Sequence, residues 1–196
     1  MIQDFVEFLL RKTWFSTDLS SILDLAERAL SDSVTDWRYY EHDVTYEKVF
    51  DAITGNTGAL ASFLYRLGRL VAEETGSLDS DPSRAIHWLM RETCACEIYL
   101  SNNIGVGFRV VHGVGTVIGL RNRIGSGFTV YHGCTIGHKS RGGKGCDIGT
   151  DFTMYARASA IGELRVGNRV TLGAHALLLS DVPDDTICVG VPAKAC

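Results

Sequence analysis

The chain has 196 residues, of which 45% are hydrophobic and 21% charged, close to the averages of soluble globular proteins, so the composition excludes bulk disorder. Nineteen Lys and Arg against 23 Asp and Glu give a net charge of −4, which argues against a general nucleic-acid-binding protein because such proteins carry a basic excess. No apolar run approaches the roughly 18 residues of a membrane span, so we expect no membrane partner.

The first residues, MIQDFVEFLLRK, contain a short apolar run interrupted by Asp4 and Glu7, so we expect no secretory signal. The six cysteines include no CxxC pair, which argues against a zinc ribbon. Without an export signal they are expected to be reduced thiols of a cytoplasmic protein. They are Cys94, Cys96, Cys134, Cys146, Cys188 and Cys196.

Residues 1–96 are predicted to form a helical domain. Apolar residues recur at helical spacing over residues 18–30 and again over residues 58–75, where Gly76 supplies a stop. A third helix is expected over residues 80–90, because its first residues are a capping serine followed by a proline at an early helical position.

From residue 98 onward the period changes to six. Thirteen positions form the series, and twelve of them are large and apolar: Ile98, Ile104, Val110, Ile118, Ile124, Val130, Ile136, Ile148, Met154, Ala160, Val166, Leu172 and Leu178. A six-residue period fits a chain that turns after each short edge and points one aliphatic side chain inward per edge. Three edges make a triangular coil of 18 residues, so residues 97–196 are predicted to form a stacked prism.

The register slips twice, and interruptions of a stacked repeat map to loops. Two extra residues lie between Val110 and Ile118, and six lie between Ile136 and Ile148. The second insertion predicts a protruding loop over residues 138–147. It is rich in glycine and carries three cations, Lys139, Arg141 and Lys144.

Two histidines follow equivalent edges of successive coils. Grouping the six-residue edges in threes places His112 and His132 on one face, about 4.8 Å apart, with His112 in the first bulge. Glu97 precedes the first edge, at the corner where the first and third edges meet, so we expect it to approach His112. A carboxylate beside an imidazole fixes its tautomer and stabilises its charged form, as a general base requires.

The motifs together resemble a known family. The hexapeptide run, the HG bulge, VYHGCTIG, the Gly/Lys loop and VPDDTICVGVPAKAC are similar to the left-handed β-helix acyltransferases, and the preceding helices make the chain most similar to serine O-acetyltransferases. The resemblance covers residues 97–196 and extends weakly through residues 43–75, where YRLG echoes a family helix. It implies an α+β fold, with a helical domain followed by a left-handed parallel β-helix of hexapeptide repeats.

The resemblance also implies the chemistry. His112 matches the family's general base, and Glu97 matches its aspartate partner with one more methylene. A backbone N–H near Gly137 and His138 is implied to face the oxyanion, and Asp43 matches a carboxylate that helps to hold serine. Acetyl-CoA is the implied co-substrate, and we expect neither a permanently bound cofactor nor a metal.

The remaining binding residues come from the same comparison. The family's site is shared between subunits of a trimer, with acetyl-CoA in the groove between prisms, where Ala156 and Ala174 match small residues and Lys194 faces phosphate. We further assign His132, Arg141 and Lys144 to acceptor binding, because an imidazole and two cations can face the acceptor.

Three departures from the family pattern leave the acceptor open. Val111 stands where the family has a second substrate-holding aspartate, Lys144-Gly145 stands where it has an Arg-His pair, and the loop is two residues shorter. The family tail that docks onto cysteine synthase is absent, so we do not expect that partner. The short helical half leaves a homotrimer and a dimer of trimers as alternatives.

Other readings of the sequence stay open at this stage. The first is an O-acetyltransferase acting on a sugar or polysaccharide precursor, which needs no clamp for a carboxylate. The second is a metal enzyme on the same prism, which needs three converging imidazoles. The third is a non-catalytic scaffold, and the fourth is a covalent route through Cys134 or Cys146.

Overall fold

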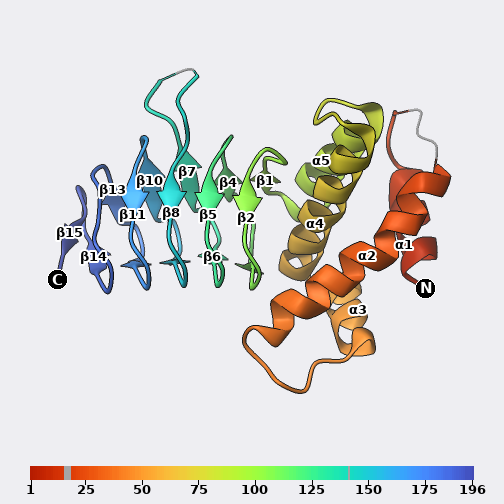
Figure 1. Cartoon of the computed structure of the whole chain (residues 1–196), viewed down its shortest axis with the longest axis horizontal. Helices are drawn as coiled ribbons and strands as arrows, with labels where there is room; N and C mark the ends of the chain where they lie inside the picture. The colour runs from red at the N-terminus through yellow and green to blue at the C-terminus, as the bar shows by residue number, and fades with distance from the viewer. Residues whose placement is uncertain (16–18, 141) are drawn as a thin grey trace.

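The computed structural model describes residues 1–15, 19–140 and 142–196, the side chains of residues 19–21 excepted. A helical domain and a long parallel β-helix lie end to end, with the two termini at opposite ends of the molecule (Figure 1). Both parts of the expected α+β fold are confirmed. The helices are α1 Ile2–Leu10, α2 Leu19–Arg38, α3 Tyr46–Gly55, α4 Thr57–Thr75 and α5 Asp81–Cys94.

The strands follow from Glu97 onward, where the sequence predicts the prism to begin. They are β1 Glu97–Ile98, β2 Asn103–Ile104, β3 Arg109–Val111, β4 Val117–Ile118, β5 Arg123–Ile124, β6 Thr129–Tyr131, β7 Thr135–Gly137, β8 Asp147–Ile148, β9 Thr153–Met154, β10 Ser159–Ile161, β11 Arg165–Val166, β12 Thr171–Leu172, β13 Leu177–Leu178, β14 Ile187–Val189 and β15 Lys194–Ala195.

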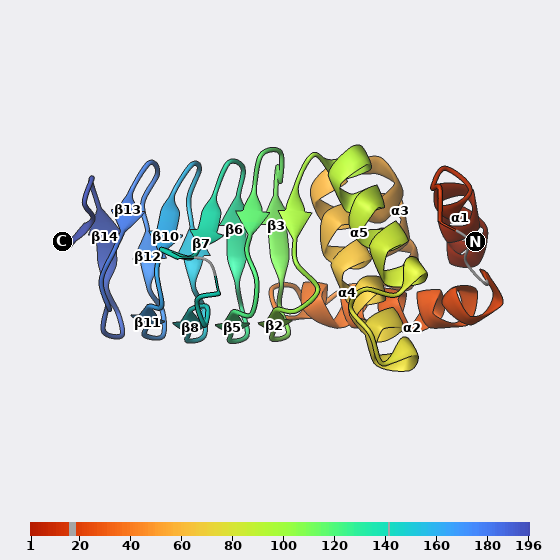
Figure 2. The same cartoon turned by 90° about the horizontal axis from the view of Figure 1, so that it is seen from above.

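The strands form three sheets because each strand from β1 to β14 pairs with a strand one coil away, while β15 pairs with β14 directly before it. The orders are β1-β4-β7-β10-β13, β2-β5-β8-β11 and β3-β6-β9-β12-β14-β15, and only the last pair is antiparallel among the described strands. Figure 2 shows the coils in a row, with β2, β5, β8 and β11 along one edge. The pairing joins Ile98 to Ile118 and Ile118 to Ile136, as the six-residue period requires.

The core of the β-helix is a set of side-chain ladders. The inward aliphatic positions are buried, as predicted from the sequence. Phe108, Phe128 and Phe152 add a second ladder, with ring centroids 5.7 and 5.8 Å apart and nearly parallel planes. Asn102 accepts a bond from the backbone N–H of Asn122 in the next coil, so a corner is held by stacked amides as well.

Local signals define the helix ends. The Asn56 side chain accepts the N–H groups of Gly58 and Ala59 and so begins α4, while Gly76 ends it in the left-handed conformation. Ser80 caps α5, with the proline in its first turn, as expected. The structure extends the helix predicted over residues 18–30 to Arg38 and adds α1 and α3, which lie outside the three predicted helices.

A buried ion pair joins the two halves of the molecule. Asp36 of α2 accepts two bonds from Arg66 of α4, at 2.8 and 2.7 Å, and further bonds from the backbone N–H groups of Gly107 and Phe108. Arg66 donates in turn to the carbonyls of Ile104 and Gly105. The helical domain is therefore fixed against the second and third edges of the first coil.

Candidate active site

The bulge after β3 carries His112. Gly133 donates its N–H to the carbonyl of Val114, so the coil resumes its ladder after the two inserted residues His112 and Gly113. His112 has a backbone φ of +51° and an exposed side chain, while Gly113 is buried beside Cys96. The predicted bulge is confirmed, and it turns the imidazole out of the prism.

A pocket of about 210 Å³ opens beside His112, between the helical domain and β3. Helices α2, α3 and α4 form one wall, and the outer face of β3 forms the other. Gly58 lets α4 approach β3 this closely, because a Cβ at that position would overlap the carbonyl oxygen of Val110. The lining residues include Trp37, Tyr40, Asn56, Ser62, Arg109 and His112.

Arg109 contributes a cation to this pocket. Its guanidinium carbon lies 4.2 Å from the centre of the Tyr40 ring, a cation–π contact. Tyr40 is itself fixed, since its hydroxyl donates to the carbonyl of Gly107 at 2.8 Å and lies 3.1 Å from the hydroxyl of Thr129. Burial raises the pKa of Tyr40, so its hydroxyl stays neutral. Sequence reasoning missed Arg109, although its outward position two residues before Val111 was available as a signal.

The two carboxylates of the pocket are already engaged. Asp36 is held by Arg66 and by backbone N–H groups, and Glu41 pairs with Lys48 at 2.5 Å. Among the residues that the structure describes, Arg109 makes no ion pair. The pocket therefore presents one available cation beside the imidazole.

The sequence predicts that Glu97 approaches His112, but in the structure Glu97 has other partners. Its carboxylate lies 3.9 Å from Nε2 of His87 and 3.8 Å from a guanidinium nitrogen of Arg91, both on α5. No hydrogen bond or ion pair joins Glu97 to His112 in the described part of the chain. Burial lowers the pKa of His87, and the nearby Glu97 opposes that shift. The carboxylate therefore faces the helix that precedes it, a contact that spacing within the prism cannot indicate.

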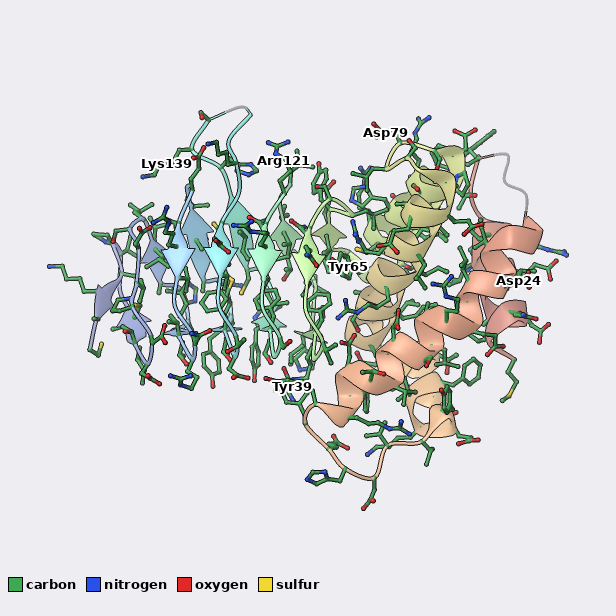
Figure 3. The ribbon with its side chains drawn as sticks, viewed as in Figure 1. Asp24, Tyr39, Tyr65, Asp79, Arg121 and Lys139 are labelled. Carbon is green, nitrogen blue, oxygen red and sulfur yellow. The ribbon has the colours of Figure 1, made fainter. Side chains whose placement is uncertain are left out.

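The expected oxyanion residues lie at another corner. Gly137 ends β7 and His138 begins the protruding loop, at the turn from the first sheet to the second, whereas His112 lies at the turn from the third sheet to the first. Figure 3 places Lys139 on the loop side and Tyr39 on the opposite side of the β-helix. One chain therefore does not bring Gly137 and His138 to His112.

The loop cations have contacts within their own chain. Lys139 donates its ammonium to the carbonyl of Leu179 at 3.5 Å, and the backbone N–H of Lys144 donates to Glu163. Arg141 lies outside the described residues. None of these contacts involves the pocket beside His112.

Other candidates align with the His112 corner. His132 accepts a backbone bond from Arg157, and Ala156 accepts one from His175, so the turns containing His132, Ala156 and Ala174 stack along that corner. Ala174 is exposed and Ala156 half-buried. The corner therefore forms a continuous edge that begins at the imidazole.

Two further candidates lie elsewhere. Asp43 is exposed in the loop between α2 and α3, next to the pocket but outside its lining, and Lys194 is exposed at the far end of the β-helix. Neither lines the pocket beside His112.

The alternative chemistries find little support in the described residues. Cys134 and Cys146 are buried, and burial raises the pKa of each thiol, which leaves it a poor nucleophile at neutral pH. In the ranges that the structure covers, no three His, Cys, Asp or Glu side chains converge to hold a metal. The same ranges contain no helix with the length and apolar character of a membrane span.

Known proteins resemble this chain in sequence and in fold. No family model matches it. A serine acetyltransferase of Helicobacter pylori strain J99 is 38% identical over 114 residues, which are 57% of this chain and 67% of that protein. Soybean serine acetyltransferase complexed with serine superposes with a TM-score of 0.78 at 22% identity, covering 100% of this chain and 84% of that one.

A serine acetyltransferase in complex with CoA superposes with a TM-score of 0.77 at 19% identity, covering 100% of this chain and 84% of the other. The two structural likenesses establish the shared fold. The identity to the Helicobacter protein, over two thirds of that protein's length, establishes kinship. This chain belongs to the serine acetyltransferase family.

Proposed function

We propose that the protein transfers the acetyl group of acetyl-CoA to the hydroxyl of L-serine, with His112 as the general base. The observation that carries this proposal is the exposed imidazole of His112 on a bulge beside a pocket sized for a small molecule. The family and the relatives that bind serine and CoA supply the substrates. We place the reaction in the cytoplasm, in keeping with six free cysteines.

The reaction is a direct acyl transfer. His112 accepts the proton of the serine hydroxyl as its oxygen attacks the thioester carbonyl carbon. The carbon–sulfur bond then breaks, and the CoA thiolate takes the proton from the imidazolium. The products are O-acetylserine and free CoA, and no protein group is acylated.

Glu97 enters the proposal as the acidic partner of His112. Its support is its position, because Cys96, directly before it, lies 3.7 Å from the place of a Cβ on Gly113, directly after His112. To reach the imidazole, the carboxylate must turn away from Arg91, so Arg91 and His112 compete for it.

The site is proposed to be completed by a second subunit of a homotrimer. Gly137 and His138 then supply N–H donors to the oxyanion from the neighbouring prism, since their own corner is remote from His112. The same groove takes acetyl-CoA along Ala156 and Ala174, with Lys194 toward the phosphates. A dimer of trimers is the alternative assembly.

The acceptor is proposed to lie in the pocket, near His132 and the loop that carries Asp43. Lys144 is assigned to it from the neighbouring subunit, as is Arg141. In this chain a valine occupies the position of the family's second aspartate, which makes the acceptor the point to test.

The test is a CoA-release assay on the full chain. Acetyl-CoA is supplied with L-serine in one arm and with glucosamine, galactose and maltose in the other. We expect release with L-serine at a rate well above that of any sugar. Preferential release with a sugar overturns the assignment of serine and selects a sugar O-acetyltransferase instead.

A further inference from the structure

We infer that Arg109 binds the carboxylate of the acceptor and so selects a hydroxy acid over a neutral alcohol. This inference rests on the proposed function and names a residue that takes the place of the missing Arg-His pair of the loop. Lys144-Gly145 occupies the position of that pair, and the Lys144 backbone is bonded to Glu163 of its own prism. The pocket beside His112 holds the cation instead.

The direction of Arg109 supports the inference. In β3, residues 109 and 111 are on the outer face while Val110 is buried, and both outer residues line the pocket. His112 follows at the bulge. Three residues of extended chain span about 10 Å, a distance that the long arginine side chain and a small amino acid together bridge. A carboxylate at Arg109 therefore leaves the acceptor hydroxyl directed toward His112.

The state of the guanidinium supports it further. The guanidinium carbon of Arg109 lies over the ring of Tyr40, which is held by Gly107 and Thr129, so this contact positions the cation at the pocket wall. A guanidinium presents N–H donors in a planar fork that matches a carboxylate. No ion pair within the described residues uses these donors, and the two carboxylates of the pocket are occupied by Arg66 and Lys48.

The neighbouring charges leave this role to Arg109. Asp36 accepts hydrogen bonds from Arg66 and from two backbone N–H groups, so its carboxylate is not available to bind the acceptor. Glu41 is exposed and already pairs with Lys48, so it does not neutralise Arg109. Among the described lining residues, Arg109 therefore remains as the unpaired cation that can bind the carboxylate of the acceptor.

The experiment compares L-serine with L-serinamide, which keeps the hydroxyl and the amine but lacks the negative charge. In the wild-type protein we expect kcat/KM for serine to exceed that for serinamide. Arg109→Met is expected to lower kcat/KM for serine about 10- to 100-fold, through KM, and to leave that for serinamide nearly unchanged. Arg109→Lys is expected to restore part of the loss, because a lysine keeps the charge but lacks the fork.

The control is Arg123→Met, which removes an exposed arginine from β5, where it pairs with Asp147. This variant should leave kcat/KM for serine and for serinamide unchanged. Calorimetric binding of serine and serinamide to the same proteins, without acetyl-CoA, provides a readout that does not depend on turnover. Equal losses for both ligands in Arg109→Met, or no loss for either, overturn the inference.

The outcome separates the inference from the proposed function. If the wild-type protein acetylates another hydroxy acid, such as L-homoserine, and Arg109→Met loses it selectively, serine is wrong and the role of Arg109 stands. If serine is the substrate and Arg109→Met still prefers it over serinamide as wild type does, the role of Arg109 is wrong and the function stands. Activity on neutral sugars alone overturns both.

Discussion

At the residue scale, backbone conformation decides which substitutions are informative at the site. His112 has a φ of +51°, in the left-handed region that costs most residues about 1 kcal/mol and that asparagine tolerates well. An alanine there would combine loss of the imidazole with backbone strain. Asparagine is therefore the substitution that removes the base and keeps the bulge.

His87 predicts a pH dependence of stability. Burial lowers its pKa from 6.5, so the unfolded chain binds this proton more tightly than the folded protein. Its effect on stability is thus favourable above about pH 6.5 and is lost as the pH falls below that value. We expect His87→Gln to flatten the decline of the unfolding free energy between pH 7 and 5. Urea titrations at each pH measure the unfolding free energy, and His42→Gln, at an exposed histidine, is the control. If the unfolding free energy of wild type and of His87→Gln declines equally with falling pH, the prediction is wrong.

Gly58 predicts a coupling between packing and activity. A Cβ at this position would overlap the carbonyl of Val110, so Gly58→Ala must push α4 away from β3 and alter the pocket wall. We expect a loss of about 1–3 kcal/mol in the unfolding free energy, together with a fall in kcat/KM. Gly55→Ala is the control, since nothing lies within 4 Å of a Cβ there. Equal behaviour of the two variants in denaturation and assay would show that α4 does not need the close approach.

At the element scale, the junction between the helices and the first coil gives the pocket its shape. Tyr39, directly after α2, donates to Asp151 before β9 of the third coil at 2.7 Å, and Tyr65 of α4 donates to the carbonyl of Asn102 in the first coil at 2.9 Å. The bond to Asp151 raises the pKa of Tyr39 to about 12, so the contact persists through the neutral range. These two bonds therefore join the end of α2 and the middle of α4 to the β-helix beside the pocket.

The ion pair of this junction predicts a large effect on stability. Asp36 is 3% exposed and Arg66 13%, so Asp36→Asn leaves a buried guanidinium without its counter-charge. We expect a loss of about 3–5 kcal/mol in the unfolding free energy. The exposed pair of Arg123 and Asp147 serves as control, where Arg123→Gln should cost under about 1 kcal/mol. Chemical denaturation measures both, and a similar small cost in the two variants would refute a structural role for the buried pair.

At the scale of the whole molecule, the three-sided prism separates groups that the proposed reaction needs together. His112 lies at one corner and Gly137 with His138 at another, so a single chain holds only part of the proposed machinery. Assembly of prisms side by side brings unlike corners into contact. The homotrimer is in this sense a chemical requirement of the proposal.

The assembly predicts a measurable mass. Light scattering on the eluting full-length protein should give about three times 21.4 kDa, or twice that for a dimer of trimers. Activity should fall when the protein is diluted to concentrations at which the proposed trimer dissociates, because the proposed oxyanion donors come from a neighbouring subunit. A monomer that keeps full activity would contradict the shared site.

The sequence predicted the fold better than the site. The six-residue period predicts the core directly, because each inward aliphatic residue marks one edge of a coil. The prism and its bulge could therefore be predicted from the spacing of these residues. The contact of Glu97 with α5 did not follow, because His87 and Arg91 come from a helix whose placement no repeat encodes. Arg109 was missed for the same reason. It becomes a candidate binding residue only when Tyr40 and residues of the helical domain form the opposite wall of the pocket beside β3.

The most direct test of the account is the rate of acetyl transfer by His112→Asn. Because asparagine suits the backbone of the bulge, we expect its thermal midpoint and oligomeric mass to match wild type. Its kcat with saturating acetyl-CoA and L-serine should fall about 10²- to 10⁴-fold, the usual contribution of a general base. A folded His112→Asn protein that retains wild-type kcat would contradict the central claim that this imidazole takes the proton of the acceptor.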